Sequence, residues 1–308
     1  MQKVNQTTPP ITIPELHWST RLNGFWKAAD ACTRRAMDIF LAGLGLLCLS
    51  PFFLLIAIAI RRDSPGPIFY RGPRAGKDGR TFGILKFRTM YERAESYHGP
   101  LVTASDDDRI TSAGKWLRDT KVNELPQLWN VLVGDMSLVG PRPEDPEIVA
   151  QWPGEMRQDL LSVRPGITSP ATVLFRGEEG MLQAGNVMDV YLKNILPTKL
   201  RLDSLYVRNR TIVSDLDVLF WTCLVLLPKV SRIEVPQSML YFGVVSRITK
   251  RYLGWFCLDF LVALVAMFIS ELIWRTEGPL NLGPSVAIGL AVMTAVLVST
   301  LNYFLGVS

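Results

Sequence analysis

Basic side chains gather in three of four short polar segments in the middle of the chain. Lys86, Arg88, Arg109, Arg118 and Arg142 lie in the segments KFRTM (86–90), DDDRITSAGKWLRDT (106–120) and GDMSLVGPRPE (134–144), which surround NELPQLWN (123–130). Such cations could neutralise phosphate oxygens, and arginine can do so with two donors at once. A single Lys–Arg pair near a turn is usually a solvated surface feature, so the expectation depends on the segments taken together.

A carboxylate, Glu124, stands directly before a predicted helix that starts at Pro126. Proline suits the first helical turn, and the free backbone amides of that turn attract phosphate. Mg²⁺ is usually held by one or two carboxylates together with substrate phosphates. Glu124 could therefore hold Mg²⁺ against a diphosphate, or it could only stabilise the start of the helix.

The composition indicates a membrane protein with anionic partners. The 308 residues carry a net charge of +5, and 48% of them are apolar and bunched into long runs. No helix-turn-helix pattern, zinc spacing or aromatic–basic RNA motif is present, so we expect no nucleic-acid partner. The cysteines are widely spaced and predicted to be reduced packing residues; they are Cys32, Cys48, Cys223 and Cys257.

The first apolar run, residues 36–60, is long enough to cross a bilayer, at roughly 37 Å for 1.5 Å per residue. Basic pairs flank both ends, which opposes simple spanning because Lys and Arg favour the cytoplasmic side. Ser50 and Pro51 interrupt the run, and proline kinks a helix. Two structures remain open at this point, a kinked spanning helix and a helix that breaks at Ser50–Pro51 and returns to the same face.

Two further apolar runs, residues 254–274 and 284–306, are of spanning length. Lys250 and Arg251 precede the first run, whereas the connecting loop offers only Arg275 against Glu277. The positive-inside rule therefore predicts a transmembrane hairpin with both ends in the cytoplasm. Residues 62–250 would then be cytoplasmic.

Between these runs we expect a mostly helical domain with a small β-hairpin. The predicted strands are 67–71 and 81–87, joined by a turn at 75–80. The predicted helices are 112–118, 126–133, 147–162, 187–209 with an interruption near Pro197, and 218–230.

In order and wording, the polar segments resemble the core of the monotopic phosphoglycosyl transferase family. The resemblance rests on KFRTM, DxRIT, LR, ELPQLWNVL, GDMSLVGPRP and RPGIT (164–168), and it extends from about residue 34 to about residue 222. It implies an enzyme that transfers a sugar 1-phosphate from a UDP-sugar to undecaprenyl phosphate and releases UMP, as the first step of exopolysaccharide, O-antigen or glycan synthesis. It also implies Mg²⁺ as cofactor and a re-entrant helix broken at Ser50–Pro51.

The resemblance assigns roles to particular residues. It makes Glu124 the Mg²⁺ ligand and places Pro141, Arg142 and Pro143 beside the nucleotide. Arg176 matches an arginine of the family, and Asp203 stands in LDSLY, which also resembles a family segment. The segment after RPGIT departs from the family pattern, so the identity of the sugar is not carried over.

A second departure concerns the nucleophile. Family members attack the donor with an Asp at the position of Asn123, and a neutral amide is a poor nucleophile. Four possibilities follow: attack by Glu124, direct attack by the lipid phosphate with Asn123 orienting it, loss of activity, or replacement by another acid such as Asp135 or Asp203.

The expected fold is thus an α+β membrane protein at the bacterial inner membrane, with its catalytic domain facing the cytoplasm. Its expected parts are an N-terminal extension (1–33), a re-entrant helix (34–62), the catalytic domain (63–230), a linker (231–252) and the transmembrane hairpin (253–308). Downstream glycosyltransferases or a second copy of the chain are additional expected partners. The alternative function is a catalytically impaired membrane scaffold that binds substrate.

Overall fold

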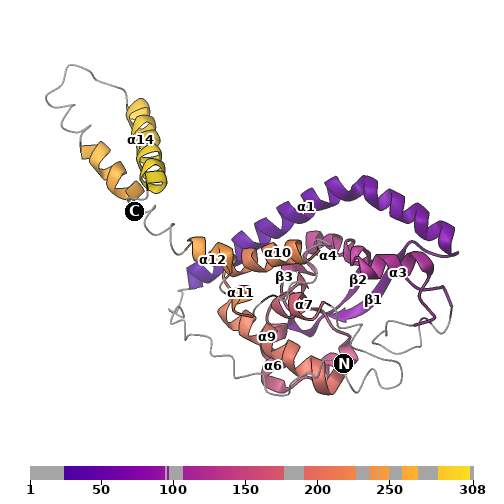
Figure 1. Ribbon diagram of the computed structural model, residues 1–308. Helices are drawn as coiled ribbons and strands as arrows, with labels where there is room; N and C mark the ends of the chain where they lie inside the picture. The colour runs from indigo at the N-terminus through magenta and orange to yellow at the C-terminus, as the bar shows by residue number, and fades with distance from the viewer. Residues whose placement is uncertain are drawn as a thin grey trace. The chain divides into compact units, whose positions relative to one another are not determined.

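The computed structural model describes residues 24–93, 96, 107–176, 191–226, 235, 237–241, 243–249, 259–269 and 284–305. The chain divides into two compact units, Met1–Tyr241 and Phe242–Ser308. In the first unit, short helices and two small sheets pack beneath one long helix, α1 (Figure 1). This mostly helical architecture with a small β-hairpin confirms the predicted class of the domain.

Helix α1 spans Gly24–Asp63 and contains Pro51 in its interior. It begins at residue 24, not at residue 34, and it is helical through Ser50 and Pro51. Proline cannot donate to the carbonyl four residues earlier, but the Ser50 hydroxyl donates to that carbonyl, Leu47 O, at 2.8 Å. The helix bends along its length without unwinding (Figure 1).

Both halves of α1 pack against the first unit. In the first half, Asp38 accepts from the Leu138 amide at 2.9 Å, and Ala42 is fully buried. In the second half, Ile56 and Ile60 join a buried cluster with Phe87 and Leu117. Between residues 39 and 58 the helix also exposes large apolar side chains; they are Ile39, Phe40, Leu44, Leu47, Phe52, Leu54, Leu55 and Ile58.

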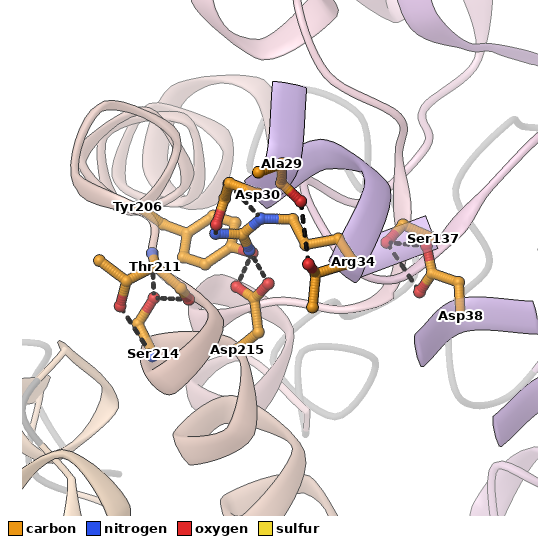
Figure 2. Close-up of polar contacts among 10 residues, drawn as sticks. Ala29, Asp30, Arg34, Asp38, Ser137, Tyr206, Thr211, Ser214 and Asp215 are labelled. Carbon is orange, nitrogen blue, oxygen red and sulfur yellow. Dashed lines mark hydrogen bonds and ion pairs between the residues drawn. The ribbon is translucent and has the colours of Figure 1, made fainter. Parts of the chain in front are cut away.

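A buried ionic network fixes the start of α1 (Figure 2). Arg34 donates to Asp30 at 2.8 Å and to Asp215, which also accepts from the Tyr206 hydroxyl. Asp215 belongs to α10 (Ile212–Leu226) and Tyr206 to α9 (Leu196–Asn209). The Arg34 guanidinium therefore joins α1 to two consecutive helices that lie far along the chain.

The β-hairpin pairs β1 (Phe69–Ala75) with β2 (Thr81–Phe87) in antiparallel register, Phe69 opposite Phe87 and Ala75 opposite Thr81. The turn contains the short helix η1 (Lys77–Gly79), in which Asp78 has a positive φ of 58°. The second strand has its predicted bounds. The first strand was predicted at 67–71 and begins two residues later, at Phe69. Asn130 clamps the free edge of β2 by accepting from the Leu85 amide and donating to the Gly83 carbonyl.

Helices α3 (Ser112–Asp119) and α4 (Gln127–Val133) confirm two predicted helices, and η2 (Val122–Glu124) lies between them. Lys121 connects α3 to η2 in the left-handed conformation, with φ 59° and ψ 11°. Gly134 ends α4 at φ 99°, a conformation that glycine adopts at little cost. Arg35 of α1 donates to the last carbonyls of α4, at Val131 and Leu132.

A second small sheet pairs β3 (Ser137–Val139) in parallel with β4 (Gly166–Thr168). The predicted single helix 147–162 is instead two, α5 (Pro146–Val149) and α6 (Gly154–Leu161). Pro153 separates them because its ring excludes the preceding residue from the helical region. Helix α7 (Pro170–Leu174) follows β4, capped by the Ser169 side chain.

The rest of the first unit is helical. A single π-turn, η4 (Tyr191–Ile195), precedes α9 (Leu196–Asn209), and Pro197 lies in the first turn of α9, where it is tolerated. Helix α10 spans Ile212–Leu226 and starts six residues before the predicted 218–230 helix, of which the last four residues lie outside the described part. Helix α11 (Gln237–Tyr241) packs on α10 through Leu240 and Val225.

The second unit contains α12 (Val244–Ile248), a helix at Asp259–Ile269 and α14 (Pro284–Leu305). Helix α14 confirms that the last predicted apolar run, residues 284–306, is helical. Its described side chains are mostly apolar and exposed. The loop that would connect a hairpin lies outside the described residues. Within the described part, Ala29–Asp63 of α1 is the one helix whose length and composition suffice to cross a membrane.

Candidate active site

The centre of the candidate site is the Glu124 carboxylate, which is held by two cations from different elements. Lys86 Nζ lies 2.9 Å from Glu124 Oε1. Arg142 donates through Nη2 to Oε1 at 2.7 Å and through Nη1 to Oε2 at 3.2 Å. The structure therefore brings together three of the predicted site residues, which come from β2, η2 and the loop after β3.

The charges in this cluster keep the carboxylate ionised. Burial by itself would raise the pKa of Glu124, but the charges of Arg142 and Lys86 and the hydrogen bonds from both outweigh it and hold that pKa well below its ordinary value. Burial lowers the pKa of Lys86, against the opposing effect of Glu124, and the Arg142 charge lowers it further. The cluster is thus an anion held between two cations.

Local structure explains why these three side chains meet. The clamp of Asn130 on β2 fixes the strand directly before Lys86. The left-handed Lys121 turns the chain out of α3 so that η2 presents Glu124 toward β2. Asn130 thus has a structural role within NELPQLWN.

The Pro141–Arg142–Pro143 segment is fixed by its backbone. Pro141 O accepts from the Gly166 amide at 2.8 Å, and both prolines are buried. The backbone of Arg142 bonds to the Asp203 carboxylate, which also accepts from Ser169 Oγ and from the Ala171 amide, both at 3.3 Å. The predicted site residue Asp203 therefore lies behind the segment and orients it.

Asp203 has a raised pKa of about 6. Burial is the main cause, and hydrogen bonds from Ser169, Ala171 and the Arg142 backbone, together with the Lys199 charge, offset only part of it. A carboxylate so enclosed is a poor nucleophile.

Beyond Pro143, a buried cluster that sequence analysis missed holds Glu144. The Tyr191 hydroxyl donates to Glu144 Oε1 at 2.6 Å, and Lys199 Nζ lies 3.6 Å from the same oxygen and 3.3 Å from the Tyr191 hydroxyl. Glu144 directly follows GPRP in the sequence, which was the available signal. No sequence pattern pointed to Tyr191 or Lys199, because they lie more than 45 residues further along the chain and only folding brings them to Glu144.

Two amide side chains flank Glu124. Asn123 is 8% exposed and Gln127 is 1% exposed. The Asn123 Oδ1 and Gln127 Nε2 atoms are buried without a hydrogen-bond partner in the described part of the chain. Gln127 was also missed from sequence, although it lies within the NELPQ motif.

The remaining predicted cations lie elsewhere. Arg88 is buried and donates to the carbonyls of Ser64 and Pro65, so its contacts are those of a residue that ties β2 to the end of α1. Arg109 pairs with Asp107 through two nitrogens, at 2.5 and 2.8 Å, and the Arg118 charge also acts on Asp107. Arg176 is partly buried at the last described position before residue 191.

The donor set suits Mg²⁺ only when a substrate supplies further oxygens. Among the described residues, no group of three His, Cys, Asp or Glu side chains could hold a metal ion. Glu124 is one firmly ionised carboxylate, and Mg²⁺ commonly binds through one carboxylate plus phosphates and water. The residues therefore fit a metal that arrives with a diphosphate.

Comparison with curated proteins gives several relatives with consistent descriptions. The chain is 36% identical over 198 residues to the undecaprenyl-phosphate glucose phosphotransferase of Komagataeibacter xylinus, covering 63% of this chain and 35% of that protein. It is 37% identical over 177 residues to a UDP-N-acetylgalactosamine-undecaprenyl-phosphate N-acetylgalactosaminephosphotransferase of Aeromonas hydrophila, covering 56% and 42%. It is 37% identical over 204 residues to the exopolysaccharide production protein PSS of Rhizobium leguminosarum bv. phaseoli, covering 63% and 94%.

The chain thus spans well under half the length of the first two relatives and almost all of the third. Residues 29–229 match the family described as Bacterial sugar transferase. This match contains most of α1, both sheets, the Glu124 cluster and α10, and with them most of the packed core of the first unit. The chain therefore belongs to the bacterial sugar transferase family.

Proposed function

We propose that the protein transfers a sugar 1-phosphate from a UDP-sugar to undecaprenyl phosphate, releasing UMP, as the initiating step of exopolysaccharide, O-antigen or glycan synthesis. The observation that carries the proposal is the Glu124 carboxylate held between Lys86 and Arg142, a charge arrangement suited to a diphosphate. The names of the relatives support the same reaction.

In the proposed step, an oxygen of the lipid phosphate forms a bond to the β-phosphorus of the donor. The bond between that phosphorus and the oxygen bridging to the α-phosphorus breaks, and UMP leaves with that oxygen and its electron pair. Lys86 and Arg142 neutralise the phosphate oxygens, which lowers the repulsion between two anionic substrates. We propose Arg176 as a further cation that binds substrate phosphate.

Direct attack by the lipid phosphate fits the described groups better than attack by an enzyme carboxylate. Both Glu124 oxygens accept from cations, which reduces their nucleophilicity. Asp203 is buried behind the Arg142 segment, and Asp135 lies 3.3 Å from the Asn130 amide in the structural clamp. In direct attack, the proposed role of Asn123 is to orient the lipid phosphate.

Glu124 is the residue that would hold Mg²⁺ together with the substrate diphosphate. When bound, the metal would supply positive charge to the phosphate oxygens. The role of this chain in that arrangement is to keep the Glu124 carboxylate ionised and fixed in place.

We place α1 in one leaflet of the inner membrane as a re-entrant helix, with the catalytic domain (63–230) in the cytoplasm and the apolar segment 253–308 as a transmembrane hairpin. Both halves of α1 pack against the same folded unit. A spanning helix would carry one end about 30 Å away across the hydrocarbon core. The exposed apolar face of α1 supplies the lipid contact.

The test is UMP release by purified protein with candidate UDP-sugars, Mg²⁺ and undecaprenyl phosphate. We expect release that requires the lipid, and no exchange of labelled UMP into UDP-sugar in its absence. Exchange without lipid would instead demonstrate a covalent intermediate. For topology, cysteines placed at residues 5 and 308 should be labelled only from the cytoplasm and one at residue 280 only from outside.

A second function, a substrate-binding scaffold without turnover, is favoured by Asn123 alone. It predicts binding of UDP-sugar without UMP release, and appearance of activity in Asn123→Asp. A scaffold would hold substrate for later glycosyltransferases.

A further inference from the structure

A polar cluster beside the active site takes no part in the reaction proposed above. It consists of Glu144, Tyr191 and Lys199 and is called the Glu144 cluster here. The Tyr191 hydroxyl donates to Glu144 Oε1 at 2.6 Å, and Lys199 Nζ lies 3.6 Å from the same oxygen. Lys199 Nζ also lies 5.1 Å from the centre of the Tyr191 ring. One carboxylate oxygen thus faces a hydroxyl and a cation, and Tyr191 itself belongs to a hydrophobic core cluster.

Only Pro143 separates Glu144 from Arg142, the cation that contacts both oxygens of Glu124. The proline ring fixes its own φ and confines the preceding residue to extended conformations. The Glu144 carbonyl accepts from the Ala75 amide at 3.0 Å, so the backbone of Glu144 is tied as well as its side chain. Because few torsions between Glu144 and Arg142 are free, a shift of Glu144 moves the Arg142 backbone.

Helix α9 holds this short segment at two points. Asp203 bonds to the Arg142 backbone, and Lys199, four residues earlier in α9, contacts Glu144. Side chains four residues apart in a helix lie on the same side of it. Lys199 and Asp203 are each only 5% exposed, so both contacts are made in the interior. One buried face of α9 therefore fixes the segment at Arg142 and again at Glu144.

We propose that the Glu144 cluster is a positioning device, which acts through Pro143 to keep the Arg142 guanidinium in register with the Glu124 carboxylate. The inference rests on the proposed function, in which Arg142 neutralises phosphate oxygens during transfer. The paired contact needs two guanidinium nitrogens in place at once, at 2.7 and 3.2 Å from Glu124. A buried ion pair is often no more stabilising than apolar side chains of the same size. The contribution of the cluster is a single orientation of the segment.

Tyr191→Phe tests the proposal because it removes the hydroxyl that holds Glu144 and keeps the ring beside Lys199. We expect kcat/KM for UMP release to fall about tenfold, since a small misplacement of a catalytic group is costly even in an intact fold. Tyr206→Phe is the matched control. It also removes a buried hydroxyl on α9 that donates to a carboxylate, but that carboxylate is Asp215 of α10. Thermal midpoints should fall similarly in the two variants, with kcat/KM unchanged in Tyr206→Phe.

A double-mutant cycle separates positioning from a general loss of stability. In an Arg142→Lys background the two-nitrogen contact no longer exists, so adding Tyr191→Phe should lower kcat/KM by less than about twofold further. A purely structural effect would instead multiply with the loss caused by Arg142→Lys. Lys199→Met is a second variant for the same cycle if Tyr191→Phe does not fold. It removes the cation and leaves the Tyr191 hydroxyl on Glu144, and its loss should also disappear in the Arg142→Lys background.

Three results would overturn the positioning role. They are unchanged kcat/KM in folded Tyr191→Phe protein, an equal loss in Tyr206→Phe, and a fully multiplicative loss in the Arg142→Lys background. Failure of the proposed function gives a different result, because the unaltered protein would then bind UDP-sugar but release no UMP with any donor. The same cycle is then measured on UDP-sugar affinity by calorimetry, where independent losses from Tyr191→Phe and Arg142→Lys would refute the positioning role. An unaltered protein that binds no UDP-sugar would refute both proposals.

Discussion

Arg142 contacts both carboxylate oxygens of Glu124 with two nitrogens of one guanidinium, across 18 residues of sequence. This planar pairing cannot be reproduced by lysine, which offers a single charged nitrogen. We predict that Arg142→Lys lowers kcat/KM for UMP release by about tenfold or more. The control is Arg74→Lys, which keeps the charge, alters contacts to Asp145 at 3.3 Å and to the Pro73 carbonyl at 2.6 Å, and should leave kcat/KM within about twofold. Equal losses in the two variants would contradict a geometric role for Arg142.

Removing the charge of Glu124 should abolish UMP release. Glu124→Gln keeps the shape but leaves Lys86 and Arg142 facing a neutral amide, and we expect activity to fall by at least about a hundredfold. The dependence of any residual activity on divalent ions should also weaken, since the carboxylate is the proposed metal ligand. A titration of Mg²⁺ against initial rate measures both effects. An unchanged Mg²⁺ requirement in this variant would remove Glu124 from the metal site.

Asp203 should make the protein less stable as the pH rises from about 4 to about 6. Its folded pKa of about 6 lies above the ordinary aspartate pKa of about 3.8, so the folded state binds the proton more tightly than the unfolded state does. The contribution of Asp203 to the free energy of unfolding is complete below about pH 4 and falls between about pH 4 and about pH 6. At neutral pH it is about 3 kcal/mol lower.

Asp203→Asn removes this titration. Unfolding of the two proteins in denaturant, followed between pH 4 and pH 7, should give a difference in free energy that grows with pH and levels off above about pH 6. A constant difference across that range would show that the pKa of Asp203 is not raised.

The Arg34 network should be worth much more than an exposed ion pair. Arg34→Met leaves the buried Asp215 with the Tyr206 hydroxyl but without its cation, and we expect a loss of about 3 kcal/mol in the free energy of unfolding. The Arg208 side chain, which pairs with Asp159, is 55% exposed, so Arg208→Met should lower the free energy of unfolding by less than about 1 kcal/mol. Chemical unfolding in detergent micelles measures both. A similar loss in the two variants would mean that α1 does not depend on this network for docking.

Lys121→Gly should stabilise the turn before the active site. Lys121 adopts φ 59°, where glycine avoids the cost that a Cβ imposes. We expect a gain of up to about 1 kcal/mol with activity retained, because the backbone keeps its path into η2. Lys121→Val, with a branched Cβ, should lose stability and UMP release together. Thermal midpoints and initial rates of both variants check the prediction, and a stable, active valine variant would contradict it.

Local chemistry in the sequence was sufficient to predict many elements. The turn residues at 75–80, Pro126 and Gly134 correctly placed the hairpin and the limits of α4, because their backbone preferences act over a few residues. At Pro51, where proline removes a backbone hydrogen bond, α1 stays helical. The Ser50 hydroxyl satisfies the carbonyl that the proline leaves free, a compensation that depends on side-chain geometry.

The sequence by itself determined the cations, the single acid Glu124, the apolar segments and the resemblance of the ordered motifs to one family. Only the tertiary structure decided which cations meet that acid: Lys86 and Arg142 do, while Arg88 is committed to carbonyls at the end of α1. It also brought Tyr191 and Lys199 to Glu144 and buried Asn123 Oδ1 and Gln127 Nε2 where no described residue bonds to them. The physical reason is that charge and hydropathy are properties of each residue, whereas pairing and burial depend on which distant segments pack together.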